Sequence, residues 1–144
     1  MTIDIREIRD RLPQEIVALE SEARREGYQH ITRLIQEWSA GETRFEHDGE
    51  RLFGAYVGET LAGIGGMTVE HDVAGALRMR RFYVHPAMRR YRVGRTIALA
   101  LLDHARSFCS IVTVHAGNDD AAKFWESLGF QPRGRDGHSH VFEL

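Results

Sequence analysis

The sequence predicts a mixed α/β domain built around a mainly antiparallel sheet. Three observations predict this class. Two amphipathic helical patterns open the chain, three alternating strand patterns follow with no helix between them, and two further helical patterns flank a short β-branched strand. The length of 144 residues is that of one domain. We therefore expect residues 1–144 to form a single domain.

The N-terminal part of the chain predicts two helices. Residues 14–26 follow Pro13, which suits the first turn of a helix, and Gly27 suits the end of that helix. Residues 30–40 repeat an apolar side chain every three or four positions and stop at Gly41. Each helix therefore has one face to bury against another element.

The central part, residues 51–84, predicts an antiparallel meander. Strands over 52–57 and 60–69 are joined by a tight turn at residues 58–59, and a third strand covers 77–84. Connections this short favour sequential antiparallel pairing, because a parallel pair needs a long crossover.

The third strand of the meander contains a phase slip. Its apolar side chains stand at odd positions in Leu77 and Met79, but at even positions in Phe82 and Val84. Because side chains alternate between the two faces of a sheet, a β-bulge near residues 80–81 would reconcile the two halves. The alternative is a strand that is buried on both faces, with its arginines at the exposed start.

Two helices and three strands follow the meander. Gly129 suits the end of the second of these helices. The expected elements are a helix over 93–108, a strand over 111–115, a helix capped by Asp119 or Asp120 that runs through Leu128, and a strand pair over 130–133 and 139–143 around Gly134 and Asp136-Gly137.

The composition excludes several classes of protein. Hydrophobic residues make up 42% and charged residues 28%, which is typical of globular domains and not of disordered chains. The single cysteine, Cys109, excludes an internal disulfide and a cysteine-based zinc site, and we expect it to be a small buried apolar side chain. Residues 1–11 are charged and lack the apolar core of a signal peptide, so we expect a cytoplasmic protein without a membrane partner.

The charge balance points in two directions. The formal net charge of −2 argues against a nucleic-acid partner, which favours a basic domain. All but one of the 19 basic residues are arginine, with Lys123 as the exception. A GC-rich genome explains the set as a whole, whereas the arginines clustered within residues 78–95 are placed for a specific role.

Residues 84–96 predict an anion-binding site. A strand ends there, a basic loop follows, and a helix begins, so that free backbone N–H groups and a partial positive charge face the loop. Gly94 permits close approach of a ligand to the backbone, and the arginines add charge-assisted hydrogen bonds to phosphate. We expect a diphosphate-like anion at Arg89 to Thr96, although a solvated basic loop is the alternative. Neither the Walker nor the Rossmann glycine pattern is present.

This segment resembles the acyl-CoA pyrophosphate loop, [RQ]-x-x-G-x-[GA], of the GNAT superfamily of N-acetyltransferases. Arg89 and Gly94 match its first and last positions, and Arg92 stands where the family has its first glycine. A second block, residues 118–130, is similar to the family's N-x-x-A-x-x-F-Y-E-x-L-G-F, with Trp125 at the tyrosine position.

The resemblance implies the GNAT fold, in which the fourth and fifth strands splay apart. It also implies transfer of an acetyl group from acetyl-CoA to a primary amine of a small molecule or peptide. The bulge would aim a backbone N–H at the thioester carbonyl as an oxyanion hole. The residues implied to bind acetyl-CoA are Phe82, Tyr83, Val84, Arg89, Arg90, Tyr91, Arg92, Val93, Gly94, Arg95, Thr96, Asn118, Phe124 and Trp125.

The catalytic groups are less sharply defined. Trp125 replaces the tyrosine that often protonates the leaving thiol in this family, and an indole N–H is only a hydrogen-bond donor. Tyr83 and Tyr91 are nearby alternatives. Glu70 and His115 are the candidates for the base that takes a proton from the amine. The competing interpretation is a turn carboxylate and a solvated histidine.

The acceptor pocket is expected beside the two N-terminal helices, with Tyr28, Arg33 and Trp38 as candidate substrate contacts. An arginine of the run Arg78, Arg80 and Arg81 that points into this pocket would imply an acceptor with a carboxylate or phosphate; otherwise these arginines face solvent. His138 and His140 form an H-x-H pair, but two ligands do not make a metal site, so no metal is expected.

A second interpretation of the whole chain is a non-catalytic GNAT-like domain that binds acyl-CoA as a sensor or interaction module. The tryptophan at position 125 and the arginine at position 92 motivate it. Domains of this class often pair, so a homodimer is compatible with the sequence, which does not identify the acceptor.

Overall fold

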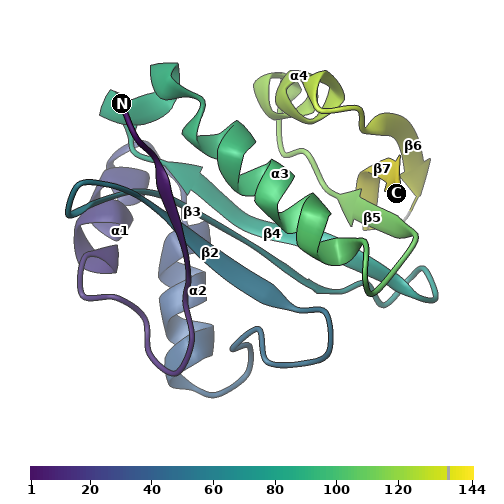
Figure 1. Cartoon of the computed structure of the whole chain (residues 1–144), viewed down its shortest axis with the longest axis horizontal. Coiled ribbons are helices and arrows are strands. Elements are labelled where there is room, and N and C mark those ends of the chain that lie inside the picture. The colour runs from purple at the N-terminus through teal and green to yellow at the C-terminus, as the bar shows by residue number, and fades with distance from the viewer. Residues whose placement is uncertain (136) are drawn as a thin grey trace.

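The computed structural model describes every residue except 136 and has one seven-stranded sheet with helices on both faces (Figure 1). The spatial order of the strands is β1-β2-β3-β4-β5-β7-β6, and every pair is antiparallel except β4–β5. The strands are β1 (Asp4–Glu7), β2 (Arg51–Val57), β3 (Thr60–Val69), β4 (Ala76–Val84), β5 (Ile111–Val114), β6 (Gln131–Arg135) and β7 (His138–Glu143). The helices are α1 (Ile16–Arg25), α2 (His30–Ser39), the 3-10 helix η1 (Pro86–Tyr91), α3 (Val93–Ala105) and α4 (Asp119–Ser127).

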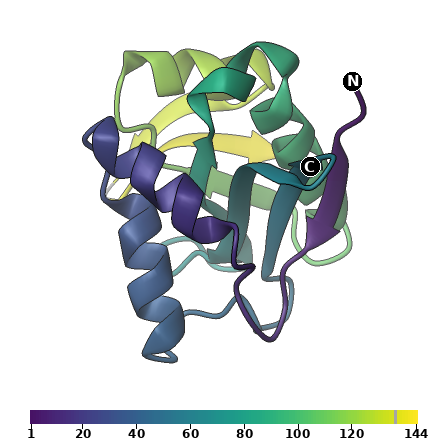
Figure 2. The same cartoon turned by 90° about the vertical axis from the view of Figure 1, so that its left-hand side faces the viewer.

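The two faces of the sheet hold separate apolar clusters. On one face α3 buries Val93, Ile97 and Leu101 against side chains such as Met67 and Met79. On the other face α1 and α2 bury the stripes that the sequence predicts, and Figure 2 shows these two helices on the side of the sheet away from α3. Burial of each such side chain contributes about 1.5–3 kcal/mol, so both helix layers are firmly held.

The predicted bulge is present in β4. Ile64 pairs with Tyr83 and Gly66 pairs with Arg80, so that one residue of β3 stands opposite two residues of β4. Arg81 is the first of those two residues and adopts a left-handed conformation with φ of 63°. The bulge turns Phe82 and Val84 to the α3 side, which explains the phase slip in the sequence.

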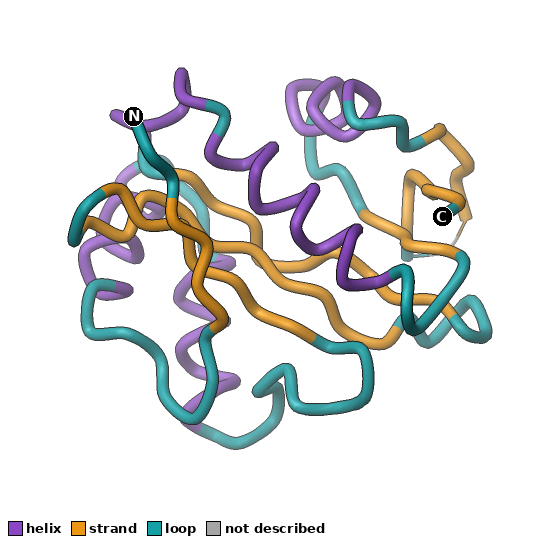
Figure 3. The backbone as a smooth tube through the Cα atoms, in the orientation of Figure 1, coloured by secondary structure: helices purple, strands orange, loops and turns teal. Residues whose placement is uncertain are grey.

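The parallel pairing of β4 and β5 is short. Residues Ala76, Leu77 and Arg78 pair with Ile111, Val112 and Thr113, and the register then ends. The rest of β4, residues 79–84, is paired with β3 alone. The two strands therefore splay apart toward the start of α3, as the family resemblance implies. The order of helices, meander, helix, strand, helix and hairpin can be followed along the chain in Figure 3.

Three details differ from the sequence-based expectations. The edge strand β1 was not predicted, because its four residues include three charged ones. The helix expected over 93–108 ends at Ala105, where two backbone N–H groups bond to the Ala105 carbonyl and turn the chain, leaving Phe108 51% exposed. The cap of α4 is Asn118, whose Oδ1 accepts from the Ala121 N–H at 2.8 Å, and not Asp119 or Asp120.

The other predicted helices and strands agree with the structure within a few residues, except that Asp136 lies outside the described residues. Cys109, which was expected to be buried, is only partly buried. Among the residues described, no helix combines the length and the apolar character needed to cross a membrane.

Candidate functional site

The start of α3 presents unpaired backbone donors. Arg92 occupies the N-cap position with a left-handed φ of 61°, and its side chain does not cap the helix. The first-turn N–H groups of an α-helix have no partner within the helix, so those of α3 face the loop with the partial positive charge of the helix end. Arg90 and Arg92 are exposed and Arg95 is half-buried beside them. This end of α3 therefore offers an anion several donors at once.

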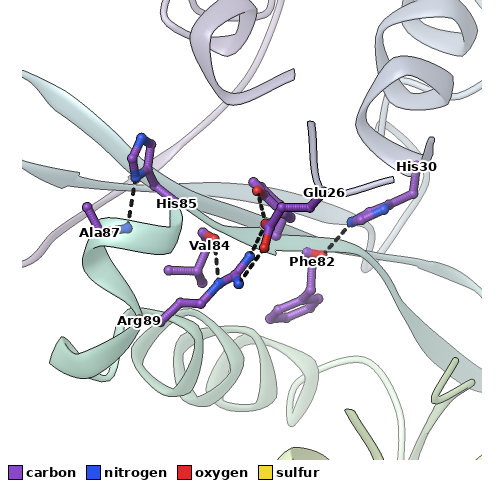
Figure 4. A network of polar contacts seen from close by, with 8 residues as sticks. Glu26, His30, Phe82, Val84, His85, Ala87 and Arg89 are labelled. Atoms are coloured by element: carbon purple, nitrogen blue, oxygen red, sulfur yellow. Dashed lines mark hydrogen bonds and ion pairs between the residues drawn. The ribbon is translucent and has the colours of Figure 1, made fainter. Parts of the chain in front are cut away.

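Arg89 is held differently from the other arginines of this loop. It donates to both carboxylate oxygens of Glu26, at 2.9 Å for one of them, and its Nε donates to the Val84 carbonyl at 3.2 Å (Figure 4). The Tyr83 hydroxyl donates to the same carboxylate, and the Arg89 guanidinium lies 5.5 Å from the centre of the Tyr83 ring. Arg89 thus ties the end of α1 to β4 and the loop.

This network changes the pKa values of its members in a consistent direction. Hydrogen bonds from Arg89 and Tyr83 lower the pKa of Glu26, and the Glu26 carboxylate raises the pKa of Arg89. Burial, together with the Glu26 carboxylate, raises the pKa of Tyr83 far above its usual range. The Tyr83 phenol therefore stays protonated and committed to Glu26.

The two motif blocks meet where α3, β4 and α4 come together. The Phe82 ring packs edge-on against Trp125 at 4.8 Å between centroids, and Trp125 packs on Phe124 at 4.9 Å. Trp125 is 5% exposed and belongs to the core on the α3 face. An aromatic cluster therefore forms the floor between the splayed strands and α4.

Gly94 has no structural requirement to be glycine. It lies in helical conformation in the first turn of α3, and a Cβ built there would lie 3.4 Å from both Phe124 and Val84, which is ordinary contact distance. Glycine in a helix costs about 0.5–1 kcal/mol relative to alanine. Without a Cβ at this position, the backbone at the start of α3 is more open to an approaching group than it would be with alanine.

His30 lies at the bulge, although sequence reasoning did not single it out. It is the first residue of α2, and its Nε2 lies 2.8 Å from the Phe82 carbonyl oxygen. Because that oxygen only accepts, Nε2 carries the hydrogen and Nδ1 holds the lone pair of the neutral ring. Burial, with Arg81 and Arg33 nearby, lowers the pKa of His30 in spite of the Phe82 hydrogen bond.

Glu70, one of the two predicted bases, is buried in a polar cluster. Its carboxylate accepts from the Thr113 hydroxyl at 2.6 Å and from the Asp72 N–H at 3.0 Å. Arg78 lies 3.7 Å away and His138 3.8 Å away. Burial alone would raise the pKa of Glu70, but the hydrogen bonds and neighbouring cations outweigh it and lower the pKa. Both oxygens are thus engaged at the closed end of the β4–β5 pair.

The other predicted residues are scattered. His115 is exposed directly after β5, and Tyr91 is 48% exposed on η1. Tyr28 is 41% exposed and packs edge-on against His30 and Tyr83, while Arg33 is exposed on α2. Trp38 does not line an open surface as expected, because it is 7% exposed within the core under α2.

The two histidines of the H-x-H pair do not share a site. His138 is buried near Glu70, whereas His140 Nε2 pairs with Glu126 at 2.8 Å. In the part of the chain that the structure describes, no three His, Cys, Asp or Glu side chains gather where they could hold a metal ion.

Solved structures of other proteins superpose on nearly the whole of this chain. A protein from Exiguobacterium sp. 255-15, assigned provisionally as an acetyltransferase, superposes with a TM-score of 0.89 at 22% identity, over 99% of this chain and 94% of that one. An acetyltransferase from Streptococcus agalactiae 2603 gives a TM-score of 0.78 at 16% identity, over 99% and 98%. The PaiA N-acetyltransferase from Thermoplasma acidophilum, solved with coenzyme A, gives 0.67 at 19% identity, over 98% and 97%. The TM-scores establish a shared fold, and at these low sequence identities they establish nothing beyond it.

The sequence itself carries the family assignment. No curated protein sequence matches the chain. The family model described as the acetyltransferase (GNAT) family matches residues 13–130, which include both N-terminal helices, the meander, α3 and α4. The chain therefore belongs to the GNAT acetyltransferase family.

Proposed function

We propose that this chain transfers an acetyl group from acetyl-CoA to a primary amine of a small molecule or peptide. The observation that carries the proposal is Gly94 in the first turn of α3, where the folded chain accepts a Cβ but has none. The uncapped N–H groups and the exposed Arg90 and Arg92 around it supply the charge complement of a diphosphate. A neighbour of the same fold was solved with coenzyme A.

The rest of the cofactor would run between the splayed strands. Phe82, Tyr83 and Val84 have no β5 partner, so those of their backbone groups that His30, Arg89 and β3 do not engage can pair with the amides of pantetheine. Asn118, Phe124 and Trp125 border the same gap from the α4 side. The bulge at Arg81 leaves backbone N–H groups outside the ladder, and one of them can donate to the thioester carbonyl.

His30 is our first choice for the group that accepts the proton of the amine. Its neutral ring has a free Nδ1 lone pair, and Nε2 fixes the ring at the bulge through the Phe82 carbonyl. Glu70 is a weaker choice because both of its oxygens are engaged, and His115 because it is exposed beyond the end of β5. Since the Tyr83 hydroxyl is held by Glu26, we propose that the thiol leaves as thiolate or takes a proton from water.

Release of free thiol from acetyl-CoA, measured with a panel of primary amines, polyamines and amino acids, tests the function. We expect turnover with at least one amine. In the Gly94→Asp variant, kcat/KM for acetyl-CoA should fall about tenfold or more, because a carboxylate then faces the diphosphate. Aspartate in the first turn favours the helix, so the loss should come without loss of stability.

The Gly94→Ala variant is the matched control, since its Cβ makes only ordinary contacts. It should fold at least as stably as the native chain and lose less affinity than the aspartate variant. Tight binding of coenzyme A in calorimetry with no turnover across the panel would favour the sensor that the tryptophan at 125 suggests. Absence of coenzyme A binding would overturn both functions.

A further inference from the structure

A polar pocket of about 860 Å³ lies between the loop that follows α2 and the strands β3 and β4. Loop residues 41–44 and 46–48 and the buried Glu50 form one wall, and Thr68 and Val69 at the end of β3, with His71, form another. Arg80 of β4 completes the lining one residue before the bulge. The pocket is therefore on the α2 side of the sheet, next to the place where the strands splay.

Arg80 differs from the two arginines beside it. Arg78 lies 3.7 Å from Glu70, and Arg81 donates to Glu37 at 2.8 Å. Arg80 is half-buried, yet among the residues that the structure describes it makes no ion pair or side-chain hydrogen bond. Burial and the neighbouring Arg81 and Arg78 lower its pKa, and the carboxylates of Glu37 and Glu50 only partly oppose them. An anion bound from outside the chain would stabilise a half-buried guanidinium that has no ion-pair partner.

Thr68 supplies a second unsatisfied group in the same pocket. The residue is 6% exposed, and its Oγ1 is buried without a hydrogen-bond partner among the described residues. Thr68 pairs with Arg78 across the strands, whereas Arg80 pairs with Gly66, so Thr68 and Arg80 occupy diagonal positions on one face of the sheet. A buried hydroxyl without a hydrogen-bond partner and a guanidinium without an ion pair, both among the described residues, thus lie on the same wall.

We propose that the acceptor amine also carries a carboxylate, which binds to Arg80 and Thr68 in this pocket. The inference rests on the proposed acetyl transfer and names the substrate class. The lining also holds the carboxylates of Glu42, Glu46, Asp48 and the buried Glu50, so a carboxylate with one negative charge is repelled less than a phosphate dianion.

The test compares ω-amino carboxylates of increasing length with alkylamines of equal length, following thiol release from acetyl-CoA. We expect kcat/KM to favour at least one of the amino carboxylates over its matched alkylamine at least tenfold. Arg80→Gln should abolish that preference and leave rates with alkylamines unchanged, and Arg80→Lys should restore part of it. Arg106→Gln, at an exposed arginine at the end of α3, is the control and should keep the preference.

A native enzyme that shows no carboxylate preference, or a preference that survives in Arg80→Gln, overturns the inference. Turnover with simple amines alone would leave the proposed function intact. If no amine is turned over, calorimetry of 6-aminohexanoate with the CoA-saturated chain decides the question. Binding that is lost in Arg80→Gln supports the carboxylate site, and absence of binding to the native chain overturns it.

Discussion

The two halves of β4 differ in how fully their polar groups are paired. In the first half, residues 76–78 pair with β3 and β5, and the carboxylate of Glu70 is surrounded by donors. In the second half the strand loses β5, contains a left-handed residue in the bulge, and ends beside an uncapped helix. The first half is paired on both edges, whereas the second half leaves backbone groups on its β5 edge that a ligand could use.

The largest effect is expected at the paired end. Glu70→Ala should lower the free energy of unfolding by about 3 kcal/mol, because it leaves the Thr113 hydroxyl and the Arg78 guanidinium without their buried partner. Urea denaturation measures this change. The folded variant should keep its kcat, and a large loss of kcat at full stability would instead make Glu70 the base.

The same residue has a predictable dependence on pH. Its pKa is lower in the folded chain than its ordinary value of 4.5, so its stabilising contribution is present above that value and is lost as the pH falls through the lower, folded pKa. The Glu70→Gln variant should therefore unfold with a shallower pH dependence than the native chain below pH 4.5. Equal slopes would contradict the assignment.

At the splayed end, His30→Ala should reduce kcat about 100-fold if the imidazole takes the proton of the amine. The pH profile of native kcat/KM should rise through an apparent pKa below the ordinary histidine value of 6.5, because the folded ring favours the neutral form. His30→Gln is the control, since its amide can still donate to the Phe82 carbonyl but cannot accept the proton. A glutamine variant with native kcat and pH profile would reduce His30 to a positioning residue.

The comparison also separates what local sequence could predict from what it could not. The bulge was predictable because it shifts the alternation of apolar side chains along residues 77–84, and that shift is visible in the sequence. The loop between β4 and α3 could be singled out as a candidate anion site because a strand end, a glycine and a helix start are adjacent in the chain. Partners distant in sequence were not, since Arg89 meets Glu26 across 63 positions and His30 meets Phe82 across 52.

Glu70 illustrates the same limit from the other side. Its position after a strand placed it near the reacting groups, but the donor that engages it, Thr113, lies 43 positions away on β5. The residues next to Glu70 in the sequence do not predict the contact with Thr113. Likewise the indole of Trp125 was read as a departure from the family tyrosine, and only packing shows that its ring fills the core beneath Phe82.

The smallest expected effect is that of replacing Arg92 at the start of α3. Arg92 stands where the family has a glycine and is held at φ of 61°, a conformation that costs a non-glycine residue about 1 kcal/mol. Arg92→Gly should therefore raise the free energy of unfolding by about 1 kcal/mol, whereas Arg92→Ala, which keeps the strain, should not. Both variants lose the guanidinium and should weaken coenzyme A binding equally, with a smaller salt dependence than the native chain. Equal stabilities for the two variants would show that the loop stores no strain at this residue. Unchanged coenzyme A affinity would show that the arginine does not replace the missing glycine with a phosphate contact.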